Sequence, residues 1–153
     1  MTTPNLDLHK RAKISPPPTE AFELFTKHMA AWWPLATFSV GMEQATSVEV
    51  EPGVGGRIVE TMADGSTSVW GTVELWKPPD RIRFTWHPGT PAEEATRVEV
   101  TFRQAGSGTI VELIHSGWEN RPDGAAASAQ YDSGWDLVFG RYAEAGLGQL
   151  DEG

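Results

Sequence analysis

Apolar and polar side chains alternate near the start of the chain. The apolar members of the pattern are Leu6, Leu8, Ala12 and Ile14. A period of two is typical of a strand with one buried face, so this pattern predicts a first strand over residues 6–14. We expect the opposite face of that strand to meet solvent, since it carries Asp7, His9, Arg11 and Lys13.

The next segment, SPPPTEAFELFTKHMAAWW, has the spacing of a helix. Prolines are tolerated in a first helical turn, and Phe22, Phe25 and Met29 recur at intervals of three and four residues. Pro34 cannot continue the helical hydrogen bonds, so it should break or bend the helix. We therefore expect one helical segment that ends near Trp33, followed by an irregular stretch.

Six further strand candidates follow in series, each bounded by Gly, Pro or Asp. They cover residues 46–51, 56–62, 68–76, 81–86, 97–103 and 109–116. Short connections of this kind join antiparallel neighbours. The clearest alternation places Ile82, Phe84 and Trp86 on one face, which predicts a sheet with one buried side and one wet side.

Strand 68–76 leaves one ambiguity. Regular alternation puts Trp70 and Trp76 on the face opposite Val73, unless a β-bulge near Pro78 shifts the register. The faces of these two tryptophans stay open for that reason. Strand glutamates usually belong to a wet face, and we expect this of Glu60, Glu74 and Glu112.

A second long helical segment covers residues 125–147. Its aromatic and apolar stripe, Tyr131, Trp135, Val138 and Tyr142, has spacings of four, three and four. A stripe this apolar should be covered by the sheet. Together the segments predict a single α+β domain over residues 1–153, with its core in residues 6–147, in which a curved antiparallel sheet of about six or seven strands packs on a C-terminal helix.

Three runs of sequence resemble a known family: GTVELWKPPDRIRFTWHPG, TRVEVTFRQAGSGTIVELIHSGWEN and GWDLVFGRYAEAG. They are similar to the activator of heat-shock protein 90 ATPase homologue-like group, within the START and birch-pollen-allergen superfamily called SRPBCC. The upstream FELFTKHMAAWWPLATFSVG is similar to the matching helix and loop of bacterial members. The resemblance covers residues 14–146 and implies a helix-grip fold, in which the sheet wraps around the C-terminal helix and encloses a cavity or groove.

Charge and composition exclude several classes of function. The chain has 12 Lys and Arg against 21 Asp and Glu, a net charge of −9, which repels nucleic acid and anionic bilayers. It has no cysteine, so a disulfide or a thiolate zinc site is excluded and a reducing cytoplasm is the expected location. The N-terminus lacks the apolar run of a signal peptide, and no stretch approaches the ~18 apolar residues of a membrane helix.

The sequence contains no recognisable catalytic set. No serine lies in a GxSxG turn, the four histidines form no HxH or HxxxH pair, and PGVGG resembles a hairpin turn more than a phosphate loop, so we expect no metal or cofactor. His115 is the exception, because the family pattern turns it inward. We interpret it first as a neutral core or rim histidine, and second as a ligand contact or a general base.

The inward aromatic residues suggest a binding site. In a helix-grip fold the core-facing side chains also line the cavity, and Trp33 and Trp118 should lie at its rim. The candidate ligand contacts are Trp33, Phe84, Trp86, His115, Trp118, Tyr131 and Trp135. We expect a small hydrophobic or amphipathic molecule to bind there. The alternatives are an enzyme such as a cyclase or hydrolase acting on that molecule, and a co-chaperone-like interaction domain; a homodimer is compatible with each.

Overall fold

The computed structural model describes residues 6–150. Its strands form one antiparallel sheet in the order β2-β3-β4-β5-β6-β7-β1-β8. The strands are β1 Leu8–Ile14, β2 Ala45–Val50, β3 Arg57–Met62, β4 Thr67–Lys77, β5 Arg81–Trp86, β6 Thr96–Ala105, β7 Gly108–Ser116 and β8 Gln149–Leu150. The seven longer strands correspond to those predicted, and the two-residue β8 is an addition at the edge beside β1.

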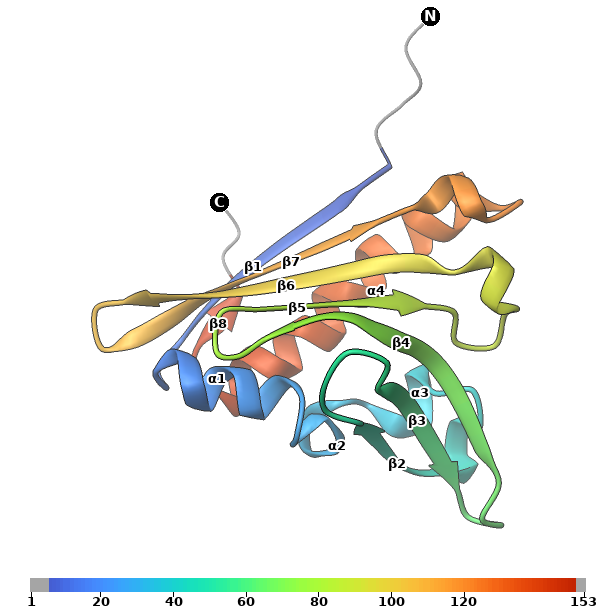
Figure 1. Ribbon diagram of the computed structural model, residues 1–153, viewed down its shortest axis with the longest axis horizontal. Coiled ribbons are helices and arrows are strands. Elements are labelled where there is room, and N and C mark those ends of the chain that lie inside the picture. Colours follow the sequence, from blue (N-terminus) through green and yellow to red (C-terminus); the bar gives the residue numbers. More distant parts are fainter. Residues whose placement is uncertain (1–5, 151–153) are drawn as a thin grey trace, which may run out of the picture.

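The long helix α4, Gly124–Ala145, crosses one face of the sheet (Figure 1). The shorter helices are α1 Pro18–Phe25, α2 Met29–Trp32, α3 Leu35–Phe38 and the 3-10 turns η1 Met42–Gln44, η2 Ala92–Glu94 and η3 Trp118–Asn120. Helices α2 and α3 contact the curled edge of the sheet at β2, whereas α1 contacts β6 and β7, and η3 contacts α4. This arrangement confirms the predicted α+β helix-grip fold. Within residues 6–150, no helix is long and apolar enough to cross a bilayer.

The single helix predicted before Pro34 is wrong, because the chain forms two helices with a break at residues 26–28. The carbonyl of Phe22 accepts both the backbone N–H of Thr26 at 3.0 Å and its hydroxyl at 2.8 Å, and such additional bonding from a Thr side chain bends a helix. The two pieces also pack on different partners: α1 on β6, and α2 on β2 and α4. Tertiary packing therefore overrides the helical spacing of this segment.

Two β-bulges in β4 decide where its tryptophans point. Ile58 and Val59 of β3 pair with Gly71 and Val69, so Trp70 is an extra residue, and Glu74 is skipped in the same way opposite β5. Each bulge reverses the alternation, so Trp70 and Trp76 share the inner side with Val73 instead of opposing it.

Close backbone packing accompanies the first bulge. A Cβ atom at Gly71 would lie 1.7 Å from the carbonyl oxygen of Thr85, so only glycine fits there. The bulges lie within β4, whereas the sequence raised only a bulge near Pro78.

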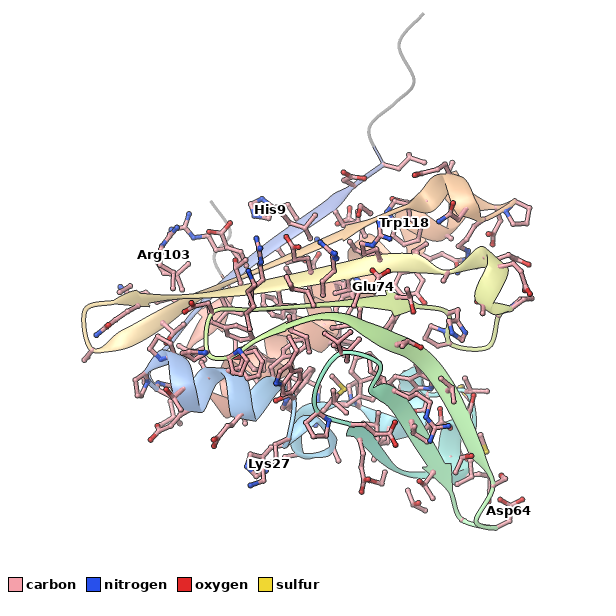
Figure 2. All side chains as sticks on the ribbon, in the orientation of Figure 1. His9, Lys27, Asp64, Glu74, Arg103 and Trp118 are labelled. Atoms are coloured by element: carbon pink, nitrogen blue, oxygen red, sulfur yellow. The ribbon has the colours of Figure 1, made fainter. Side chains whose placement is uncertain are left out.

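The outer face of the sheet carries ion pairs. Glu74 accepts a 2.7 Å hydrogen bond from Arg97, and Glu112 accepts one of 2.9 Å from His9. Figure 2 shows His9, Arg103 and Glu74 among the polar side chains of the sheet, away from the interior, and Asp64 at the tip of the β3–β4 hairpin. The prediction of a wet face is thus confirmed for Glu74 and Glu112.

Candidate functional site

A recess of about 240 Å³ opens between the middle of α4, the end of β5 and the end of α2. Its wall consists of Trp33, Trp86, Pro88, Gln130, Tyr131, Gly134, Trp135 and Val138. Pockets for drug-sized ligands usually measure roughly 300–1,000 Å³, so this recess suits a smaller molecule. Beyond this wall, side chains of the core pack between sheet and helix.

Three separate parts of the chain build the wall. On α4, Tyr131, Gly134, Trp135 and Val138 follow one another at steps of three, one and three residues, which places them on one side of the helix. The absence of a side chain at Gly134 leaves room between its larger neighbours. Trp86 is the last residue of β5 and faces inward by the alternation of that strand, and Trp33 directly follows α2.

The indole rings at the recess pack against one another. The ring centroid of Trp33 lies 5.0 Å from that of Trp70, 5.8 Å from that of Trp86 and 6.2 Å from that of Trp135. The rings of Trp86 and Trp135 are 5.9 Å apart. Tilted and edge-to-face pairs at these separations are favourable, so the wall consists of aromatic surfaces that hold each other in place.

Hydrogen bonds fix two of these rings further. The indole N–H of Trp86 donates to the hydroxyl of Tyr131 at 3.2 Å, and that of Trp135 donates to Nδ1 of His115 at 2.9 Å. Both donors are thus paired with side chains of the protein. The rings of Trp86 and Trp135 therefore have a set orientation before any ligand arrives.

His115 is fully buried and its ring is hydrogen-bonded on both sides. Because Nδ1 accepts from the Trp135 indole, the ring proton must be on Nε2, which donates to the Thr96 hydroxyl at 2.6 Å. Burial, with a smaller contribution from the charge of Arg121, lowers the pKa of His115 to about 3. The imidazole is thus neutral near pH 7, and its one lone pair is occupied.

The candidate residues divide into two groups. Trp33, Trp86, Tyr131 and Trp135 line the recess, whereas Phe84, His115 and Trp118 do not. His115 lies behind Trp135. Trp118, expected at the rim, is only 1% exposed and its ring lies 4.1 Å from that of His115. It follows Gly117, whose positive φ of 82° turns the chain back after β7.

Four wall residues were not among the predicted contacts: Pro88, Gln130, Gly134 and Val138. Val138 belongs to the apolar stripe predicted for α4, and Gly134 lies three residues after Tyr131, on the same side of the helix. Helical spacing could therefore have identified both. Pro88 enters through the turn after β5. Nothing in the local sequence pattern marks that turn as part of a site.

Glu60 corrects the prediction of a wet-face glutamate, since its side chain is fully buried. The carboxylate accepts hydrogen bonds from the backbone N–H groups of Val40 and Gly41, both at 2.7 Å. It also accepts one of 2.9 Å from the indole of Trp70. Glu60 therefore joins the loop before η1 to the tryptophan that supports Trp33.

The comparisons with known proteins agree with this architecture. The model of the family "Activator of Hsp90 ATPase homolog 1-like protein" matches residues 15–145. Among the residues that the structure describes, no three His, Asp or Glu side chains are grouped so that they could hold a metal ion. None of the curated proteins compared with the chain matches it.

Solved structures share the fold over nearly the whole chain. An anthrahydroquino-gamma-pyrone synthase, Txn09, solved in complex with SUM, is 31% identical, with a TM-score of 0.65; the match covers 90% of this chain and 95% of that one. The Aha1 dimer from Colwellia psychrerythraea is 17% identical, with a TM-score of 0.67 and coverages of 92% and 95%. DynU16, a putative protein in the dynemicin biosynthetic locus, is 21% identical with a TM-score of 0.65, over 92% of this chain and 47% of that one.

Proposed function

The chain belongs to the Activator of Hsp90 ATPase homolog 1-like family, and from that premise we propose that it binds a small, flat, apolar or amphipathic ring compound in the recess beside α4. The family and its structural neighbours fit a ligand-binding SRPBCC domain. Three indoles and a phenol line the recess, and the flat faces of such rings favour stacking or edge contacts with another aromatic ring.

The observation that carries the proposal is that the aromatic wall is fixed in advance. Trp86 and Trp135 use their N–H groups inside the protein, on Tyr131 and His115, so their rings need little reordering when a ligand enters. Binding costs less free energy when side chains are already ordered. A recess of about 240 Å³ limits the ligand, or the part of it that enters, to a few fused rings.

The relative with 31% identity supports the same class of ligand. Txn09 is named as the synthase of an anthrahydroquino-gamma-pyrone, which is a flat polycyclic compound. Its identity to this chain exceeds that of the other structures described above. A ring compound of related shape is therefore the first class of ligand to test.

That relative also favours a second candidate, an enzyme that acts on the bound ring compound. His115 does not line the recess and its lone pair is occupied, so it is a poor general base. The phenol of Tyr131 reaches the recess and is the better proton donor. Incubation of the protein with a candidate compound, followed by mass spectrometry of the small molecule, separates catalysis from binding alone.

A titration with naphthalene, followed by quenching of tryptophan fluorescence, tests the binding proposal. Gly134→Leu should fill the recess and reduce the affinity at least about ten-fold, which is the loss of about 1.4 kcal/mol of contact. Leucine is a better helix former than glycine by roughly 0.8 kcal/mol, so the variant should remain folded.

Ala129→Leu is the matched control, because it adds the same side chain at an exposed position of α4 that does not line the recess. The control should bind naphthalene like the wild type. Equal affinity in Gly134→Leu and the wild type would place the bound ring elsewhere and contradict the proposal.

We also propose that the protein acts in the cytoplasm, in keeping with its lack of cysteine. We further propose a homodimer, since a neighbour with the same fold was solved as a dimer. Sedimentation equilibrium at micromolar concentration decides between monomer and dimer.

A further inference from the structure

Trp33, a residue of the recess wall, carries a buried donor without a partner. Its side chain is only 6% exposed, yet no described residue accepts a hydrogen bond from Nε1. Buried polar groups in native proteins are nearly always hydrogen-bonded, so each exception calls for a reason. The neighbouring indoles differ, since those of Trp70, Trp86 and Trp135 all donate to a side chain of the protein.

The hydroxyl of Tyr131 is a second donor without an acceptor. Its oxygen accepts from Trp86, but no described residue accepts the hydroxyl proton. The charged groups near the phenol are Arg121, which has only N–H donors, and Asp123, whose carboxylate accepts from Arg121 at 2.8 Å. Burial raises the pKa of Tyr131 above its usual 10.0, so the phenol keeps its proton near pH 7.

Both residues line the same recess, but the Trp33 nitrogen is covered by protein, so the Tyr131 hydroxyl is the donor that a ligand can reach. The other wall residues contribute aromatic or aliphatic carbon, apart from Gln130. The side chain of Gln130 can donate or accept, but it belongs to an exposed residue at the edge of the recess. A ligand inside the recess therefore meets the Tyr131 hydroxyl proton, on an oxygen that already accepts from Trp86.

We propose that the ligand carries an acceptor oxygen on its ring, a carbonyl or a phenolate, which accepts the Tyr131 hydroxyl proton. This inference rests on the proposed function and narrows its ligand class from flat apolar rings in general to oxygenated ones. A hydrocarbon ring would leave the Tyr131 hydroxyl proton without an acceptor, whereas a ring oxygen would accept it. Such pairing discriminates between ligands, because a donor that a ligand covers without accepting from it loses its hydrogen bond to water.

Two probes of similar shape isolate the contribution of the oxygen. Chromone has two fused rings and a carbonyl oxygen, and naphthalene has two fused rings and no oxygen. The affinity of each is measured by fluorescence quenching in the wild type and in Tyr131→Phe, which removes only the hydroxyl. We use the ratio of the two affinities within one protein, because it does not depend on how stable that variant is.

The ratio of chromone to naphthalene affinity should fall about five-fold in Tyr131→Phe, the size of one neutral hydrogen bond. Tyr142→Phe is the matched control: it removes the other tyrosine hydroxyl, which bonds to the carbonyl of Ala21 away from the recess, and should leave the ratio unchanged. An unchanged ratio in Tyr131→Phe, with both probes bound, overturns this inference and leaves the proposed function standing. If neither probe binds the wild type, the proposed function fails and this inference fails with it.

Discussion

Helix α4 covers two aromatic regions that differ in how their polar atoms are used. At the α1 end, formed by Phe22, Phe25, Trp32, Phe102 and Tyr142, Tyr142 donates to the carbonyl of Ala21 and Trp32 to that of Leu24. At the recess end, formed by Trp33, Trp86, Tyr131, Trp135 and His115, no described residue accepts from the Trp33 indole or takes the Tyr131 hydroxyl proton. Aromatic content and open volume occur at both ends, since recesses also border Phe22 and Phe102, so the use of the polar atoms distinguishes the candidate site from core.

Truncation at the two ends should separate stability from binding. Phe25→Ala removes a ring packed on Trp32, Phe102 and Tyr142, and should lower the free energy of unfolding by about 3–5 kcal/mol. Trp135→Ala should cost less, because one side of that ring already borders the recess. Urea denaturation measures both losses.

The two variants should rank the other way round in their loss of naphthalene affinity. Naphthalene affinity should survive in folded Phe25→Ala and be lost in Trp135→Ala. Retained binding in Trp135→Ala would remove the distinction between the two ends.

The buried imidazole gives the recess end a pH dependence. The folded protein holds His115 neutral, with a pKa of about 3, while the unfolded chain takes up a proton below about pH 6.5. Stability must therefore fall as the pH drops from 6.5 towards 3, and this group alone accounts for about 2–3 kcal/mol between pH 7 and pH 4.5.

His115→Phe removes this titration. The variant should be less stable at pH 7 by about 1–3 kcal/mol, because the Trp135 indole loses its acceptor, but its stability should decline less on acidification. Urea titrations at pH 7 and 4.5 measure both effects, and His28→Gln, at an exposed position, is the control. An equal decline in His115→Phe and the wild type would show that His115 does not titrate as described.

Glu60 tests whether the support behind the recess matters. Glu60→Gln replaces an acceptor oxygen with an NH₂ group that faces N–H donors, so at least one of the three bonds to Val40, Gly41 and Trp70 must break. We expect a loss of about 1–2 kcal/mol in stability. Hydrogen exchange at the amides of Val40 and Gly41 should accelerate, and unchanged exchange would contradict the role of Glu60 as an anchor.

The sequence predicted the strands well because their alternation is local. Ile82, Phe84 and Trp86 are all buried, as their spacing requires, and the stripe on α4 faces the sheet. The bulges at Trp70 and Glu74 could not be read in this way. They depend on how β4 pairs with β3 and β5, and the alternation of apolar and polar residues within β4 does not reveal that pairing.

The candidate site was predicted in part for a related reason. Alternation and helical spacing identified the aromatic residues that face the interior. They could not separate residues that line open space from residues that lie behind the wall, such as His115 and Trp118. Glu60 was missed because its partners are backbone groups of a loop some 20 residues away, brought close only by folding.

The central claim is that ring compounds bind at the recess end of the interior. The chain contains seven tryptophans, and their indole N–H signals in a ¹H–¹⁵N spectrum report on both ends at once. Addition of chromone should shift the signals of Trp33, Trp86 and Trp135, through ring currents and contact, and leave those of Trp32 and Trp76 in place. Shifts confined to Trp32 and Trp76, or no shift at saturating chromone, would contradict the account.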